Sequence, residues 1–365
     1  MSSLSPYDEA QGRRRYRKTR FLSKTVQWIE KADFEAKIVI AGNHDVTLDK
    51  TFYAEFGTYF HNQTPQSPEA CINLLNSSST ITYLDHSSAT IIMDKHPSLR
   101  TRFTVFGSPY SPKIGMWAFG YDRTHPDGPT ETEPGTASGI LTAESLWSEI
   151  PLDTDIVVTH TPPYTHCDES TSKRRAFGCE DLRRALWRVR PKLAVCGHVH
   201  EGRGAETVRW DVLGASGAPY TELGVERWED PGAGQANNKM SLVDLTSRGG
   251  KRPLDNHDDP AAGRGVHESS RGKGSGPCGH FVDTTTTATS MAEATALQGF
   301  GTRGVGGNPN LSVRCDRAAL CCRMGRRETC VVNCAIAATN WPHTGGKKFN
   351  KPIVVDLDLP VLDDD

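Results

Sequence analysis

The stretch KLAVCGHVHEGRG, residues 192–204, decides how the rest of the sequence is interpreted. Its apolar first half predicts a short buried strand that ends at Cys196. Gly197 then stops the strand, and His198 and His200 follow at positions i and i+2. Side chains two residues apart in an extended chain point to the same side, so both imidazoles can approach one site.

Two other apolar runs end in the same way. KIVIAGNHD, residues 37–45, ends in Asn43 and His44, and DIVVTHTPP, residues 155–163, contains His160 directly after its apolar part. Ligands of open α/β sheets bind beyond the carboxyl ends of the strands. Imidazole and amide groups suit divalent metals, and a histidine that is not a ligand can act as a general acid. A single histidine after a strand is more often a hydrogen-bonded loop residue, but three such strand ends predict a metal-dependent site.

The remaining pattern predicts an α/β fold. Helical spacing of apolar residues indicates helices at 21–31, 68–76, 142–150 and 180–190, the third with Thr142 as its cap. Runs of β-branched and aromatic residues indicate strands at 80–84, 89–94, 103–108, 155–160, 192–196, 207–214, 239–245, and within 328–342 and 351–360. The strand, helix and strand over 155–200 predict parallel pairing. The runs at 80–84 and 89–94 predict a hairpin, and residues 46–67 read as a loop.

Composition excludes several classes of protein. A net charge of -2 gives no sign of a general nucleic-acid binder, and the sequence has no apolar run of about 18 residues that would span a membrane. The first twenty residues are basic and lack the apolar core of a signal peptide, so we expect a cytoplasmic protein with free thiols. The hydrophobic fraction of 36% is low, and the segment 246–327, rich in Gly, Ser and Thr, predicts a disordered insertion.

The motifs GNHD, a single His after a strand, and GHVH occur in an order that resembles the calcineurin-like metallophosphoesterases. The wording of KIVIAGNHDVTLD, GSPYSP, DIVVTHTPPY and PKLAVCGHVHEGRG is similar to the metallophosphoesterase-domain-containing branch, in particular its fungal members. The resemblance runs from about residue 21 to 214 and resumes over about 328–360.

The resemblance implies a two-sheet αββα sandwich with a dinuclear centre of divalent ions, which would be Mn, Fe or Zn. Asn43, His160 and His198 would bind the second metal and His200 the first. His44 would contact phosphate and protonate the leaving oxygen. The implied reaction is attack of a metal-activated hydroxide on a phosphate mono- or diester. The expected partner is a small phosphate ester, with a nucleotide as one candidate, and neither a membrane nor a stable nucleic-acid partner is expected.

One departure from the family pattern bears on activity. The family carries a strand end with Asp-x-His and another with Gly-Asp before GNHD, and neither occurs before Gly42, where Asp8 and Asp33 are the aspartates present. We therefore expect a sandwich without its first strands, one metal ion or none, poor solubility and little or no phosphatase activity. The expected units are an unmatched basic stretch at 1–20, a truncated phosphoesterase domain at 21–228, a largely disordered insertion at 229–327 and a returning β segment at 328–365.

Two alternatives stay open. The chain could be a catalytically inactive scaffold that binds nucleotide or protein partners, or a hydrolase with a single metal on Asn43, His160 and His198. The loop 108–138, with Trp117 and Phe119, is the candidate wall of the substrate pocket. The other histidines of the matched region are expected to be structural or solvated: His61, His86, His96, His125 and His166.

Overall fold

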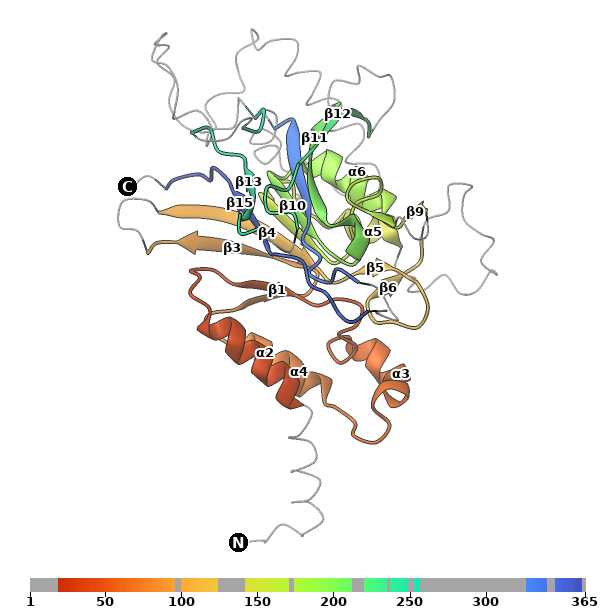
Figure 1. Cartoon of the computed structure of the whole chain (residues 1–365). Helices are drawn as coiled ribbons and strands as arrows, with labels where there is room; N and C mark the ends of the chain where they lie inside the picture. Colours follow the sequence, from red (N-terminus) through yellow and green to blue (C-terminus); the bar gives the residue numbers. More distant parts are fainter. Residues whose placement is uncertain are drawn as a thin grey trace, which may run out of the picture.

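In the computed structural model, two β-sheets pack face to face and helices cover their outer faces (Figure 1). The structure describes residues 19–95, 100–123, 142–170, 174–211, 220–234, 237–248, 253–256, 326–339 and 345–362. The predicted α/β class and the layered sandwich are confirmed within these ranges. The N-terminal stretch at 1–18, most of the insertion predicted at 229–327 and the segment 124–141 lie outside the described residues.

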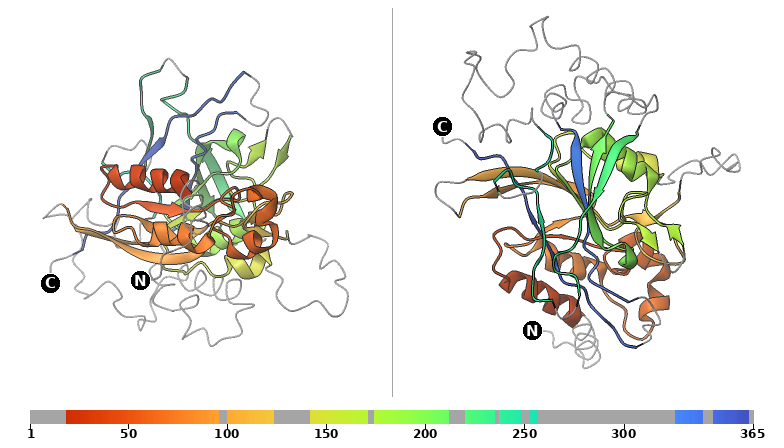
Figure 2. Two further views of the ribbon diagram at one scale, coloured as in Figure 1. Left: turned by 90° about the horizontal axis from the view of Figure 1, so that it is seen from below. Right: turned by 45° about the horizontal axis from the view of Figure 1, so that its top comes forward.

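The smaller sheet holds two parallel strands, β1 (Ile38–Ile40) and β2 (Thr82–Leu84). Three helices lie over its outer face: α2 (Thr19–Lys31), α3 (Lys50–His61) and α4 (Pro68–Asn76). Their apolar faces form one cluster that includes Val26, Tyr53 and Leu75. Seen from below, these helices lie in front of the strands (Figure 2, left). The first site-bearing strand, β1, is therefore held from its outer side by helices.

The larger sheet has seven strands in the order β12-β11-β14-β10-β7-β4-β3. The strands are β3 (Ser87–Met93), β4 (Thr101–Ser108), β7 (Ile156–Thr159), β10 (Leu193–Cys196), β11 (Gly204–Trp210), β12 (Glu222–Arg227) and β14 (Glu328–Asn333). The helices α5 (Ala143–Trp147) and α6 (Glu180–Val189) cover its outer face and bury side chains such as Leu146, Leu182 and Leu186. Full burial of each such leucine stabilises the fold by about 1.5–3 kcal/mol. Strand β7, helix α6 and strand β10 form the predicted parallel unit.

The two sheets share an apolar core between their inner faces. Leu84 of β2 packs there with Phe103 and Val105 of β4, and Ile38 and Ile40 of β1 border the same cluster. A third, two-stranded parallel sheet of β13 (Ser241–Asp244) and β15 (Ile353–Asp356) packs against another part of the large sheet. The remaining short elements are β5 (Ser111–Pro112), β6 (Gly120–Tyr121), β8 (Glu169–Ser170), β9 (Arg175–Ala176) and the 3-10 turn η1 (His200–Gly202). None of the helices in the described ranges has the length and apolar character needed to span a bilayer.

Strand β14 comes from far along the chain and yet lies inside the large sheet. It pairs parallel with β10 and antiparallel with β11, so the C-terminal part of the chain supports the strand that delivers the GHVH motif. In Figure 2, right, this blue strand lies among the green strands. All six residues of β14 are buried, including its apolar centre of Cys330, Val331 and Val332.

The structure corrects two predictions about local pairing. The predicted hairpin of 80–84 with 89–94 is wrong: β2 pairs with β1, and β3 pairs with β4 instead. The four residues between the two runs had suggested a turn, but they carry the chain from one sheet to the other. The loop predicted before residue 68 contains α3, whose N-cap Asp49 accepts a hydrogen bond from the Phe52 N–H at 2.9 Å. The aromatic residues of α3 recur at helical spacing along one face, at positions 52, 53, 56, 59 and 60, so the prediction missed a helical pattern that the sequence contains.

Candidate metal centre

The three predicted strand ends meet at one place. Strands β7 and β10 are parallel neighbours, so His160 and His198 follow them at the same edge of the large sheet. Strand β1 belongs to the facing sheet, and the turn after it delivers Asn43 to the same point. The donors therefore come from both sheets. The strand order within either sheet does not by itself bring Asn43 together with the two histidines.

Three donor atoms converge here. Nε2 of His160 lies 2.8 Å from Oδ1 of Asn43 and 3.1 Å from Nδ1 of His198. The two imidazole rings are 4.7 Å apart between centroids, and their planes are inclined at 63°. The fold thus brings three predicted site residues into one cluster, although Asn43 is 117 positions from His160 and 155 positions from His198 in the sequence.

The backbone around the cluster is tightly fitted. The N–H of His160 donates to the Ser108 carbonyl at 3.0 Å, and the N–H of Gly197 donates to the His160 carbonyl at 3.2 Å. A Cβ atom on Gly42 would lie 2.7 Å from Cε1 of His160, so only glycine lets the chain pass against that ring. His198 has a φ of 64°, a left-handed conformation that turns its ring back toward His160.

Burial keeps these imidazoles neutral. Desolvation, helped by the neighbouring His198, lowers the pKa of His160 to about 3. Desolvation also lowers the pKa of His198 to about 4, with smaller contributions from His200, His44 and Arg123. A neutral imidazole offers a lone pair, which is the form that binds a metal ion. At neutral pH the cluster is an uncharged set of donors facing one another.

His44 and His200 lie beside this cluster. His44 is exposed, and its ring is 4.0 Å from the ring of Trp117 between centroids. Desolvation lowers the pKa of His44, although Asp45 acts in the opposite direction. Nδ1 of His200 is buried and has no hydrogen-bond partner in the described part of the chain. Such an orphaned nitrogen is uncommon in a folded protein and is a usual feature of a ligand position.

The donor set fits one metal ion. The Asn43 oxygen and the two imidazole nitrogens, now joined by hydrogen bonds of 2.8 and 3.1 Å, would together hold one divalent ion. The set consists of two imidazoles and an amide, and no three His, Cys, Asp or Glu side chains of the described residues are placed to hold a metal. No hydrogen bond among the described residues joins His44 or His200 to these three donors, and no carboxylate of the described residues completes a carboxylate-bridged pair of ions.

The two aromatic residues predicted as a pocket wall differ in position. Trp117 is 38% exposed and packs between His44 and Phe60, so it lies at the mouth of the site. Phe119 is buried in the helical layer with a φ of 54° and is not available as a wall. Arg123 was missed: its charge acts on His198, and only the three-dimensional arrangement reveals this.

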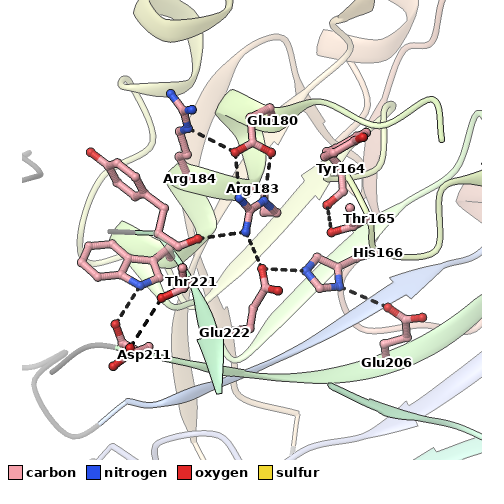
Figure 3. A network of polar contacts seen from close by, with 12 residues as sticks. Tyr164, Thr165, His166, Glu180, Arg183, Arg184, Glu206, Asp211, Thr221 and Glu222 are labelled. Atoms are coloured by element: carbon pink, nitrogen blue, oxygen red, sulfur yellow. Dashed lines mark hydrogen bonds and ion pairs between the residues drawn. The ribbon is translucent and has the colours of Figure 1, made fainter. Parts of the chain in front are cut away.

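The remaining described histidines have structural partners. His61 bonds to the Tyr53 hydroxyl at 3.1 Å, and Nδ1 of His86 lies 3.0 Å from the Ser108 hydroxyl. His166 is buried between Glu206 and Glu222 (Figure 3). These arrangements agree with a structural role, whereas His96 and His125 lie outside the described residues.

Known proteins are similar to part of this chain. A protein of Emericella nidulans named probable rhamnogalacturonate lyase C is 35% identical over 193 residues, which are 52% of this chain and 15% of that protein. The human and mouse metallophosphoesterase domain-containing protein 1 are each 31% identical over 188 residues, or 50% of this chain and 50% of each relative. The chain thus spans half or less of the length of these relatives. The profile of the calcineurin-like phosphoesterases matches residues 15–202, which include Asn43, His160 and His198. The chain belongs to the calcineurin-like phosphoesterase family.

Proposed function

We propose that the chain is a metal-dependent phosphoesterase that acts on phosphate mono- or diesters through a one-ion site. The observation that carries the proposal is the convergence of Asn43, His160 and His198, with His44 exposed beside them. Mn, Fe and Zn all accept imidazole and amide ligands, so each is a candidate ion. A divalent ion held by these three residues would polarise a phosphoryl oxygen and lower the pKa of a water molecule.

In this proposal, His44 exchanges a proton with the substrate. Its ring is exposed and contacts the Trp117 indole in a tilted arrangement, with 4.0 Å between the ring centroids. A neutral imidazole keeps one N–H, which can hydrogen-bond a phosphoryl or leaving-group oxygen. A bound phosphate would bring negative charge next to the ring and raise its pKa, which favours the protonated form that the leaving oxygen needs.

A binding scaffold without catalysis is the second candidate. The observation in its favour is that the described donor cluster contains no carboxylate. In two-metal enzymes both the attacking and the leaving oxygen are stabilised by ions, and a one-ion site lacks half of that stabilisation. We therefore expect slow turnover, and a scaffold would show none.

Hydrolysis assays distinguish the two candidates. The chain would be loaded with Mn²⁺ and assayed with aryl phosphate monoesters and diesters. The variant His160→Ala and the control His61→Ala would be assayed in the same way, since His61→Ala removes an imidazole that is bonded to Tyr53. The proposal predicts slow Mn²⁺-dependent turnover that His160→Ala abolishes and His61→Ala retains. Binding of Mn²⁺ and inorganic phosphate without turnover would favour the scaffold. Turnover that is independent of added metal, or unchanged in His160→Ala, would contradict the proposal.

A further inference from the structure

A small cavity lies between the loop after β7, the turn η1 and the adjoining ends of β11 and β12. Its volume is about 210 Å³. Asn43, His160 and His198, all in the described part of the chain, are not among its lining residues, so it is separate from the candidate metal centre. Because a water molecule occupies about 30 Å³ in the liquid, the space holds several waters or one small organic molecule.

The walls of this cavity are held together by direct contacts. The side-chain amide of Asn333 donates to the carbonyls of Cys167 and Val199, both at 2.9 Å, and so joins the loop after β7 to the residue before η1. A Cβ atom on Gly202 of η1 would lie 2.1 Å from the Cys167 carbonyl oxygen, so the two segments touch. The cavity is therefore formed by the fold before any ligand arrives.

Asp168 supplies the cavity with an acceptor that lacks a partner. This residue is 0% exposed, and it lines the cavity. Its Oδ2 accepts hydrogen bonds from the N–H of Thr165 at 3.1 Å and of Gly178 at 2.8 Å. Its Oδ1 has no hydrogen-bond partner among the residues that the structure describes. A buried carboxylate oxygen without a donor is uncommon and costly, which points to a donor supplied by a ligand.

Arg203 supplies the same cavity with a donor that lacks a partner. One terminal nitrogen of its guanidinium donates to Asp230 at 2.9 Å, and the other donates to the Lys351 carbonyl at 2.9 Å and the Ser241 hydroxyl at 3.3 Å. These bonds fix the plane of the group. Its Nε is buried and has no acceptor within the described ranges, although Arg203 lines the cavity.

The two orphaned atoms define the kind of ligand that fits. A metal ion would leave the Arg203 N–H without an acceptor, and no three His, Cys, Asp or Glu side chains of the described residues are placed to hold one. An anion alone would leave Asp168 without a donor. Apolar surface is also present, from Ala205 and from Trp228, whose indole N–H is held by the Leu242 carbonyl at 3.0 Å.

We propose that this cavity binds a small zwitterion of the α-amino-acid type. The ammonium group of the ligand donates to Oδ1 of Asp168, and its carboxylate accepts from the Nε–H of Arg203. A small apolar side chain lies against Ala205 and Trp228. Hydrogen bonds between charged groups are about twice as strong as neutral ones, so each contact contributes to both affinity and selection. This inference does not depend on the proposed phosphoesterase function.

The test uses L-alanine and two molecules that each carry one of its charges, ethylamine and propionate. Calorimetry would be carried out without added metal or phosphate on wild type, Asp168→Asn and Arg203→Lys. An asparagine keeps one oxygen for the two backbone donors but presents an NH₂ group in place of the second oxygen. A lysine retains a charge for Asp230 but lacks the Nε–H.

Two substitutions away from the cavity serve as controls. Asp49→Asn changes a carboxylate that likewise accepts two backbone N–H bonds, from Phe52 at 2.9 Å and Phe119 at 2.8 Å. Arg209→Lys changes an arginine that is paired with Asp255. Neither residue lines the cavity.

We expect saturable binding of L-alanine, with a dissociation constant that rises about 10- to 100-fold in Asp168→Asn and in Arg203→Lys and is unchanged in both controls. Ethylamine and propionate should each bind more weakly than L-alanine to wild type. Wild-type affinity for L-alanine in a folded Asp168→Asn or Arg203→Lys would overturn the inference, as would equal binding of L-alanine and either half. If Asp168→Asn does not fold, Arg203→Lys and the two half-ligands decide. No saturable binding of L-alanine at about 10 mM would show that the cavity holds water alone and would leave the proposed function intact.

Discussion

At the scale of residues, the centre depends on neutral donors held in contact by the backbone. His160 and His198, with pKa values lowered to about 3 and about 4, are uncharged at neutral pH and so do not repel a cation. The same burial that keeps them neutral leaves them few alternative conformations. Their partner Asn43 is 8% exposed, and the two histidines are partly exposed.

Gly42→Ala tests this close packing. The new methyl group would meet Cε1 of His160 at 2.7 Å and Nδ1 at 2.8 Å, so the ring must move away from Asn43. We predict a loss of Mn²⁺ affinity of about tenfold or more, and a loss of unfolding free energy of about 1–3 kcal/mol. Calorimetric titration and chemical denaturation measure the two quantities.

The control for that substitution is Gly224→Ala. A Cβ at Gly224, in the edge strand β12, would meet nothing within 4 Å. It should leave Mn²⁺ affinity unchanged. Equal affinities in Gly42→Ala and wild type would show that the fit of Gly42 against His160 has no bearing on the centre.

His44→Ala tests the proton donor. A leaving group of high pKa needs protonation more than one of low pKa. Removal of His44 should therefore lower kcat most for esters whose leaving group has a high pKa. We predict a fall in kcat of about 100-fold or more for phenyl phosphate and a smaller fall for p-nitrophenyl phosphate. The same fall for both esters would exclude proton transfer by His44 and leave it a role in binding alone.

At the scale of elements, a buried charge network fixes the loop after β7. His166 is 1% exposed and lies 3.2 Å from Glu206 of β11 and 3.4 Å from Glu222 of β12. Arg183 of α6 pairs with the same Glu222, so three elements meet at this loop (Figure 3). Burial works to lower the pKa of His166, but the hydrogen bonds to the two glutamates outweigh it, and the pKa is raised. The loop carries Cys167, whose carbonyl accepts a bond from Asn333 of β14.

The raised pKa of His166 predicts a pH-dependent stability. A group whose pKa is higher in the folded state contributes stability that is fully present below its unfolded pKa of about 6.5 and is lost as the pH rises through the folded value. Part of the unfolding free energy should therefore fall as the pH rises above about 6.5, and His166→Gln should abolish that part. Removing this buried charge should cost about 3–5 kcal/mol at pH 6.

Denaturation curves over a pH series on wild type, His166→Gln and the control His61→Gln measure this contribution. His61 bonds to a neutral hydroxyl, so its replacement should keep the wild-type slope above neutral pH. An identical pH dependence in His166→Gln and wild type would show that His166 is not charged in the folded protein.

At the scale of the whole molecule, the centre exists because two sheets approach closely. A Cβ on Gly107 of β4 would lie 2.5 Å from Cβ of Leu84 in β2 and 2.9 Å from Cγ2 of Ile40 in β1. One sheet carries Asn43 and the other carries the two histidines, so their spacing sets the donor distances.

Gly107→Ala should therefore act on the centre from a distance. We predict a loss of unfolding free energy of about 1–3 kcal/mol from overpacking, together with weaker Mn²⁺ binding. Chemical denaturation and calorimetry on the same sample would show both effects. A destabilised protein with unchanged Mn²⁺ affinity would mean that the donor cluster does not depend on the sheet spacing.

Much of this arrangement could be predicted from the sequence, because three apolar strands with His or Asn at their ends constrain the site strongly. The parallel pair β7 and β10 and the cluster of Asn43, His160 and His198 were foreseen in this way. The pairing of β2 with β1 was not, since a short gap between strands reads equally as a hairpin or as a crossing between sheets. Arg123 was also missed, because its contacts with Phe177 and Gly178 depend on tertiary packing that no local pattern records.

The most direct measurement is the stoichiometry of Mn²⁺ binding to the purified chain, by calorimetry and elemental analysis, with His160→Ala as the reference. The convergence of Asn43, His160 and His198 predicts one ion per chain, and none in a folded His160→Ala. Binding of two ions per chain with robust turnover, or one ion bound equally well by His160→Ala, would contradict the one-ion centre.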